Sequence, residues 1–176
     1  FYENTKTFHL CNKEISYIMS VLPNGHMGQL YFGKKVSERE DYSYLYETAF
    51  RPMTSYVFEG DCSLSLEHVR QEYGVYGTTD FRRPAIEILQ SNGSRICDFQ
   101  YQGHQIGKGK PKLAGLPATY TESDEEAETL CVTLKDSLTG VKVELLYTIF
   151  SKGGILARSA RVTNQGAEAV HLTTAM

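Results

Sequence analysis

The chain has 176 residues, a formal net charge of −3, 41% hydrophobic residues and 22% charged residues. This length suits one domain, and a domain of this size buries roughly 70% of its unfolded surface. The composition is that of a globular protein, and the slightly acidic balance argues against a nucleic-acid-binding protein, whose surface is usually basic.

The first 33 residues are predicted to form strands joined by tight turns. Residues 8–10 are a short apolar run, and residues 15–21 alternate with the two-residue period of a strand. Pro23-Asn24-Gly25 is a turn signal, after which residues 30–33 resume a strand.

Residues 34–52 differ in character from this sheet. A densely charged run is followed by three tyrosines at a period of two, Tyr42, Tyr44 and Tyr46. We interpret the segment as a long excursion from the sheet, because loops of this length in a compact domain are often functional. A solvated ribbon at the sheet edge is the alternative.

The middle of the chain carries the most polar turn. Residues 65–73 could form two helical turns, and residues 76–85 then read Tyr-Gly-Thr-Thr-Asp-Phe-Arg-Arg-Pro-Ala. Gly77 allows a backbone conformation that other residues resist, and Pro84 pushes Arg83 toward extended geometry. A stiff turn that carries one carboxylate and two guanidinium groups indicates a surface presented to a partner.

The next stretch combines one strand with loops. Residues 85–89 resemble a strand, and Asn92-Gly93 is a strong two-residue hairpin signal. The same residues begin a glycosylation sequon, which the hairpin explains fully. Residues 103–117, rich in Gly, Pro and Lys, and the acidic residues 122–128 are both predicted to be solvated loops, because neither matches a phosphate loop or a calcium loop.

The last third gives the clearest pattern. Apolar residues alternate with polar ones in residues 130–134 and 141–149, and residues 155–162 and 170–176 continue the series. Glycine- and asparagine-containing turns separate these runs. Short strands at this spacing are typical of an antiparallel β-sandwich.

The cysteines and histidines indicate no metal site or catalytic set. The four cysteines contain no C-x-x-C pair, and we predict that they are reduced and lie in strands or in the core, with two disulfides as the alternative. The five histidines are scattered, and the serines lack a G-x-S-x-G motif. The cysteines are Cys11, Cys62, Cys97 and Cys131.

Two further features concern the context of the chain. It holds no run of 18 apolar residues and shows no signal peptide, so we expect no membrane partner. Both ends look cut, since the chain starts at Phe1 and stops inside an expected strand at Met176. We therefore expect a piece of a longer protein.

One short block, Asp80-Phe81-Arg82-Arg83-Pro84, is especially specific. Others run over nearly the whole chain and include Leu22-Pro23-Asn24-Gly25, Leu30-Tyr31-Phe32-Gly33-Lys34-Lys35, Phe58-Glu59-Gly60-Asp61, Gly109-Lys110-Pro111-Lys112-Leu113, Tyr147-Thr148-Ile149-Phe150 and Ala157-Arg158-Ser159-Ala160-Arg161. Taken in order, these blocks resemble the opening of bacterial α-galactosidases of glycoside hydrolase family 36.

The resemblance implies an all-β, galactose mutarotase-like β-supersandwich over residues 1–176, followed by a catalytic (β/α)8 barrel. It implies a retaining, cytoplasmic enzyme that acts on melibiose and raffinose-type oligosaccharides without a cofactor or metal. Its two catalytic aspartates would lie in the barrel, so the fragment alone is expected to be inactive. The alternative is a free-standing carbohydrate-binding β-sandwich, with Tyr42, Tyr44 and Tyr46 as its aromatic platform.

The resemblance also assigns roles to five residues. In oligomeric members, the excursion reaches the active-site mouth of a neighbouring subunit, which makes Asp41 and Arg51 the candidate contacts to sugar hydroxyls. The structural alternative is a salt bridge within the loop. Asp80, Arg82 and Arg83 are predicted to hold the domain onto its own barrel, and in the isolated fragment both arginines are expected to lack partner groups.

Overall fold

The computed structural model describes residues 1–47, 49–50, 53, 55–116 and 118–176. Within these residues the chain forms nine β-strands and two 3₁₀ turns and has no α-helix, which confirms the predicted all-β class. The elements are β1 (Thr7–Cys11), β2 (Ile15–Val21), β3 (Met27–Lys34), η1 (Ser43–Leu45), β4 (Ile86–Leu89), β5 (Gln100–Lys108), η2 (Asp124–Glu126), β6 (Ala127–Lys135), β7 (Val141–Phe150), β8 (Leu156–Asn164) and β9 (His171–Ala175).

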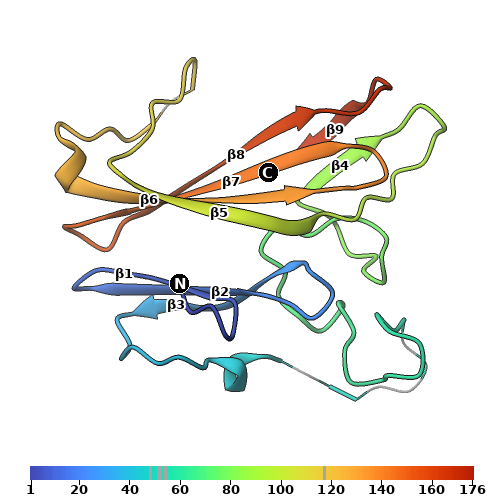
Figure 1. Cartoon of the computed structure of the whole chain (residues 1–176), viewed down its shortest axis with the longest axis horizontal. Helices are drawn as coiled ribbons and strands as arrows, with labels where there is room; N and C mark the ends of the chain where they lie inside the picture. The colour runs from blue at the N-terminus through green and yellow to red at the C-terminus, as the bar shows by residue number, and fades with distance from the viewer. Residues whose placement is uncertain (48, 51–52, 54, 117) are drawn as a thin grey trace.

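The strands form two stacked layers (Figure 1). One layer is the three-stranded sheet β1-β2-β3, and the other contains the four-stranded sheet β5-β6-β7-β8. The two-stranded sheet β4-β9 lies beside the second layer (Figure 1). All these strand pairs are antiparallel, as the sequence predicts for a β-sandwich.

The main core lies between the layers, because alternate residues of each strand point to the same face of its sheet. Tyr17 of β2 and Tyr147 of β7 meet there with their ring centroids 5.9 Å apart. Both are nearly fully buried, as are Val132 and Val143 of the four-stranded sheet. The alternation in the last third of the sequence therefore identifies the inner face of β6 and β7.

Residues 35–85 connect β3 to β4, and the described residues among them form no regular strand. It contains the predicted excursion, whose described part has only the short turn η1. The helix predicted for residues 65–73 does not form. Its backbone instead pairs with the edge of β3, where the Gln29 amide donates to the Arg70 carbonyl and the Glu72 amide donates to the Met27 carbonyl, both at 2.8 Å.

Two further predictions need correction. The stretch predicted as a loop over residues 103–117 begins with strand β5, which pairs with β6 through Lys108. Its apolar pattern is weak because β5 is an exposed edge strand. Asn92-Gly93 does form a turn, with the Gly93 amide donating to the Gln90 carbonyl, but the next strand, β5, begins only at Gln100, and β4 pairs with β9 instead.

All four cysteines are free, as predicted, and Cys97 is buried. Among the described residues, no helix is long and apolar enough to cross a membrane. No group of three or more His, Cys, Asp or Glu side chains in the same part of the chain is arranged to hold a metal ion.

Candidate functional site

The polar turn before β4 is built on a strained backbone. Gly77, Thr78 and Thr79 have φ values of 92°, 50° and 76°, a region that is costly for branched side chains. The amide and carbonyl of Gly77 pair with those of Asp80 and hold the turn closed. The side-chain hydroxyls of both threonines are buried and have no hydrogen-bond partner within the described residues. This turn fixes the direction in which Asp80 and the following arginines project.

Asp80 and Arg82 form a clasp inside the chain. Arg82 Nη2 donates to Asp80 Oδ2 at 2.8 Å, and Arg82 Nε donates to Asp80 Oδ1 at 2.9 Å. The same Nη2 donates to the carbonyl oxygens of Leu66 and Val69 at 2.8 and 3.0 Å. Gln71 Nε2 donates to the Asp80 carboxylate as well. The expectation that Arg82 lacks partner groups is therefore wrong.

The clasp changes the acidity of Asp80. Burial acts to raise the pKa of the Asp80 carboxyl, but the side-chain and backbone hydrogen bonds from Arg82 and its charge outweigh burial and hold that pKa below its ordinary value. Asp80 is thus an ionised, buried hydrogen-bond acceptor at the centre of an irregular segment. Its hydrogen bonds with Gln71 and Arg82 organise residues 66–82.

Arg83 differs from Arg82. Its side chain is exposed, and no carboxylate of the described residues lies within ion-pair distance of it. It lines a hollow of about 400 Å³, together with Arg70, Asp80, Arg82 and residues of the preceding segment. Of the three residues predicted to dock onto a barrel, Arg83 alone faces outward without an acidic partner among the described residues.

A buried carboxylate that the sequence did not indicate lies next to this hollow. Glu72 accepts hydrogen bonds from the hydroxyls of Tyr17 at 2.6 Å and Tyr147 at 2.8 Å. Arg158 of β8 completes the cluster with Nη2 at 2.5 Å from Glu72 Oε1. Burial raises the pKa of the Glu72 carboxyl, although Arg158 and the two tyrosines act in the opposite direction. Glu72 therefore joins the two sheets to the connecting segment.

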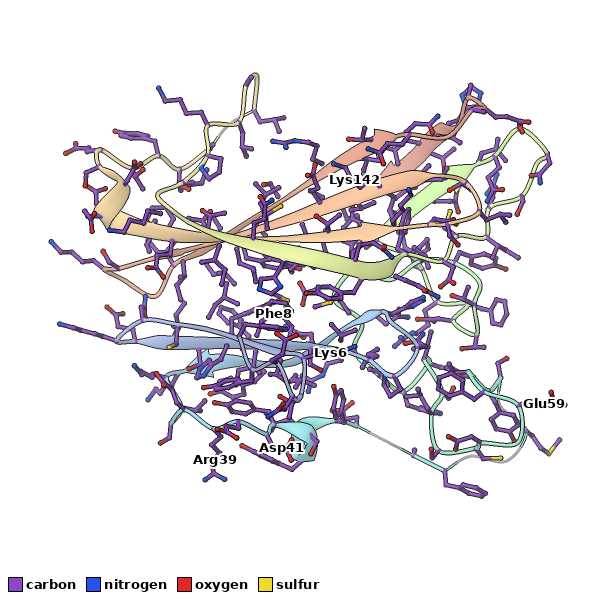
Figure 2. The ribbon with its side chains drawn as sticks, in the orientation of Figure 1. Lys6, Phe8, Arg39, Asp41, Glu59 and Lys142 are labelled. Carbon is purple, nitrogen blue, oxygen red and sulfur yellow. The ribbon has the colours of Figure 1, made fainter. Side chains whose placement is uncertain are left out.

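Asp41 lies at the surface beside η1, on the outer side of the β1-β2-β3 layer (Figure 2). Its carboxylate accepts hydrogen bonds from the Ser43 amide at 2.7 Å and the Ser43 hydroxyl at 3.0 Å. These bonds hold the pKa of the Asp41 carboxyl below its ordinary value. Asp41 forms no ion pair with a described residue, and Arg51 lies outside the described residues.

The residue after Asp41 anchors the excursion. Tyr42 is 1% exposed, and its hydroxyl lies 3.0 Å from His9 Nδ1 of β1 and donates to the Ser37 carbonyl at 3.0 Å. His9 Nε2 in turn lies 2.8 Å from the Ser16 hydroxyl of β2. Tyr42 thus ties the excursion to β1 directly and to β2 through His9, and Asp41 lies next to this anchor.

The burial of Tyr42 contradicts the predicted aromatic platform of Tyr42, Tyr44 and Tyr46. Tyr42 is buried and Tyr46 is half-buried against the Ser20 hydroxyl, so only Tyr44 of the three is largely exposed. In a strand, a period of two would put all three side chains on one face, but residues 43–45 form the 3₁₀ turn η1 instead, so the three tyrosines do not share an exposed face. A flat sugar-stacking surface of three tyrosines is absent.

Comparison with known proteins assigns the chain to a family. The family model of the "Glycosyl hydrolase family 36 N-terminal domain" matches residues 25–176. The chain belongs to this family. The family 36 resemblance drawn from the sequence is therefore confirmed, and the match contains every described residue of the clasp and of the Glu72 cluster except Tyr17.

Relatives of the family 36 chain support the same assignment over its full length. The α-galactosidase AgaA of Geobacillus stearothermophilus is 41% identical over 98% of this chain and 24% of its own length. The α-galactosidase Mel36A of Lactobacillus acidophilus is 37% identical over 98% of this chain and 24% of its own length. The chain thus spans about a quarter of the relatives that it matches.

Solved structures share the fold of this family 36 chain. The α-galactosidase of Lactobacillus brevis superposes with a TM-score of 0.94 at 35% identity, over 99% of this chain and 23% of that one. The structure of AgaA superposes with a TM-score of 0.91 at 40% identity, over 97% of this chain and 24% of its own. An AgaA variant has also been solved in complex with raffinose.

Proposed function

We propose that this chain is the noncatalytic part of a retaining α-galactosidase that removes terminal α-galactosyl residues from melibiose and raffinose-type oligosaccharides. The observation that carries the proposal is the family 36 match, together with α-galactosidase relatives that align with 98% of the chain. Residues 1–176 form one β-sandwich unit in this proposal, and the intact enzyme is cytoplasmic and needs no cofactor or metal.

The catalytic groups of such an enzyme lie outside this chain. A retaining glycosidase uses two carboxyl groups about 5–5.5 Å apart, one as nucleophile and one as acid/base. The carboxylates at the sites described above already have structural partners, with Glu72 buried against Arg158 and Asp80 clasped by Arg82. As the family resemblance implies, the proposed mechanism places both catalytic aspartates in the (β/α)8 barrel, and the chain contributes packing.

The chain has two surfaces for this packing. The Arg83 side lies against the protein's own barrel, and the excursion of residues 34–52 reaches the active-site mouth of a neighbouring subunit in a homo-oligomer. Asp41 is the proposed contact to sugar hydroxyls there, because its carboxylate is exposed, ionised and held in place by Ser43. Arg51 keeps the same proposed role on sequence grounds alone.

The direct test is galactose release from raffinose and melibiose by the intact protein. We expect release from both sugars, with the freed galactose first appearing as the α-anomer, because two inversions at the anomeric carbon give net retention. Absence of galactose release, or first appearance of the β-anomer, would contradict the proposed activity.

A further inference from the structure

Two neighbouring hollows form one continuous surface beside β4 and β9. The larger, of about 840 Å³, is lined mainly by apolar side chains from β7, β8, β9 and the loop before η2. The smaller is the 400 Å³ hollow at Arg83. Glu72, Ala85 and Met176 line both. We call the larger one the trough and the smaller one the basic hollow.

The trough exposes apolar groups to an unusual degree. Leu172 of β9 is 49% exposed and Leu116 is 62% exposed, and both line it beside Val162 and Ala160 of β8. Contiguous apolar surface of this kind, bordered by polar groups, marks a site of interaction with another protein surface. The partner should therefore present apolar side chains to β8 and β9.

The basic hollow has a surplus of positive charge. The charge of Asp80 is matched by Arg82 at 2.8 Å, and that of Glu72 by Arg158. Arg70 has only Glu47, at 3.7 Å, and both side chains are more than half exposed, so this pair is weak. In the described part of the chain, two guanidinium groups, those of Arg70 and Arg83, thus remain without an effective counter-charge.

No carboxylate among the described side chains lies within ion-pair distance of Arg83. The five residues outside the described set are Thr48, Arg51, Pro52, Thr54 and Pro117, and none of them is acidic. Guanidinium groups bind carboxylates through paired, charge-assisted hydrogen bonds, which are about twice as strong as neutral ones. The hollow therefore fits an aspartate or glutamate supplied from elsewhere.

We propose that an element of the same protein, outside these 176 residues, lies along the trough with its apolar side chains and places an aspartate or glutamate on Arg83 in the basic hollow. This rests on the proposed function, in which the chain is about a quarter of an α-galactosidase, the length relation seen in its relatives. Arg83 is the outward contact, while Asp80 and Arg82 shape the turn that presents it.

Zero-length crosslinking of the intact protein tests this proposal. In the Arg83→Lys variant, a carbodiimide should join the side chain at position 83 to a carboxylate outside residues 1–176, and mass spectrometry identifies that residue. Arg95→Lys is the matched control. Arg95 is an exposed arginine whose Nη1 lies 3.3 Å from Glu87, so its variant should give a crosslink to Glu87 within this chain.

The outcomes separate clearly. A crosslink at position 95 without one at position 83 overturns the proposal. A crosslink from position 83 to a residue within 1–176, or to a second copy of the protein, overturns it as well.

Charge reversal is an independent test. Arg83→Glu should lower the melting temperature of the intact protein at low salt, and this variant should lose less stability than the unaltered protein when salt is added. Lys13→Glu, in the exposed turn between β1 and β2, is the control and should show neither effect.

The same preparations keep this inference distinct from the proposed function. Galactose release from raffinose by the unaltered intact protein tests the activity alone. A protein that releases galactose but gives no product at position 83 retains the function and loses the inference. A position-83 product with no galactose release does the reverse.

Discussion

The Glu72 carboxylate accepts a hydrogen bond of 2.8 Å from the Tyr147 hydroxyl, and this contact joins the segment that precedes β4 to the centre of the four-stranded sheet. Tyr17 reaches the same carboxylate from the opposite sheet. The sandwich is therefore held at its middle by a charged group with a 1% exposed side chain. Such a group stabilises a fold only while all of its partners are in place.

Removal of this carboxylate should strongly destabilise the chain. Glu72→Ala leaves two buried tyrosine hydroxyls and Arg158 without their acceptor, and breaking a buried pair in this way costs about 3–5 kcal/mol. Urea denaturation of the 176-residue chain measures the loss. Glu125→Ala is the control, because Glu125 pairs with Lys108 in full solvent, and it should leave the unfolding midpoint unchanged. Equal effects of the two substitutions would refute the structural role of Glu72.

The two buried carboxylates should respond to pH in opposite directions. The pKa of Glu72 is raised by burial, so its stabilising contribution is complete below its unfolded pKa of about 4.3 and declines as pH rises through the folded value. The pKa of Asp80 is lowered despite its burial, because Arg82 outweighs that burial, so its contribution is present above about pH 4 and is lost as pH falls through the folded value.

Unfolding free energies measured from about pH 3 to about pH 8 check both signs. The difference between the unaltered chain and Glu72→Gln should shrink as pH rises, and the difference between the unaltered chain and Asp80→Asn should grow. If both differences changed in the same direction, one of the two pKa assignments would be wrong.

Two glycines, Gly140 and Gly93, allow the cost of a strained backbone to be separated from the cost of a steric overlap. Gly140 and Gly93 have φ values of 74° and 83°, so alanine costs each about 1–2 kcal/mol through the left-handed backbone alone. An added Cβ at Gly140 would also lie 2.8 Å from the Gly166 Cα, whereas at Gly93 nothing lies within 4 Å. Gly140→Ala should therefore lower the urea midpoint clearly more than Gly93→Ala. Equal midpoints would show that the turn after β8 moves aside without cost.

The Asp41 proposal predicts a change in selectivity with retained stability. Asp41→Ala in the intact protein should change the ratio of kcat/KM for melibiose to that for stachyose, because a contact at the mouth of the site is made more fully by the longer sugar. Asp61→Ala is the matched control, since Asp61 is also exposed and its carboxylate accepts the Ser63 amide in the same local motif. An unchanged ratio in Asp41→Ala, or an equal change in both variants, rules the contact out.

The sequence predicted the regular part of this fold because its alternation is local. Residues 141–149 alternate apolar and polar side chains except at Leu146, and they form the inner strand β7 with a pattern that needs no distant information. Strand β5 was missed because an exposed edge strand buries few side chains and so leaves little alternation. Leu66 and Val69 suggested a helix, but pairing of Arg70 and Glu72 with the edge of β3 outweighs that local preference.

The sites were only partly predictable for the same reason. Asp80 and Arg82 are two residues apart, so their grouping was visible in the sequence, whereas the carbonyl oxygens of Leu66 and Val69 that complete the clasp come from a non-local turn. Glu72 had no signal at all. A single glutamate in a polar stretch is usually solvated, and only the meeting of β2, β7 and β8 around it makes it central.

We propose that this β-sandwich serves an α-galactosidase without carrying its chemistry. Galactose release from raffinose, measured side by side for the intact protein and for the 176-residue chain, is the decisive test. We expect release by the intact protein and none by the chain alone. Release by the chain alone, or no release by the intact protein, would contradict it.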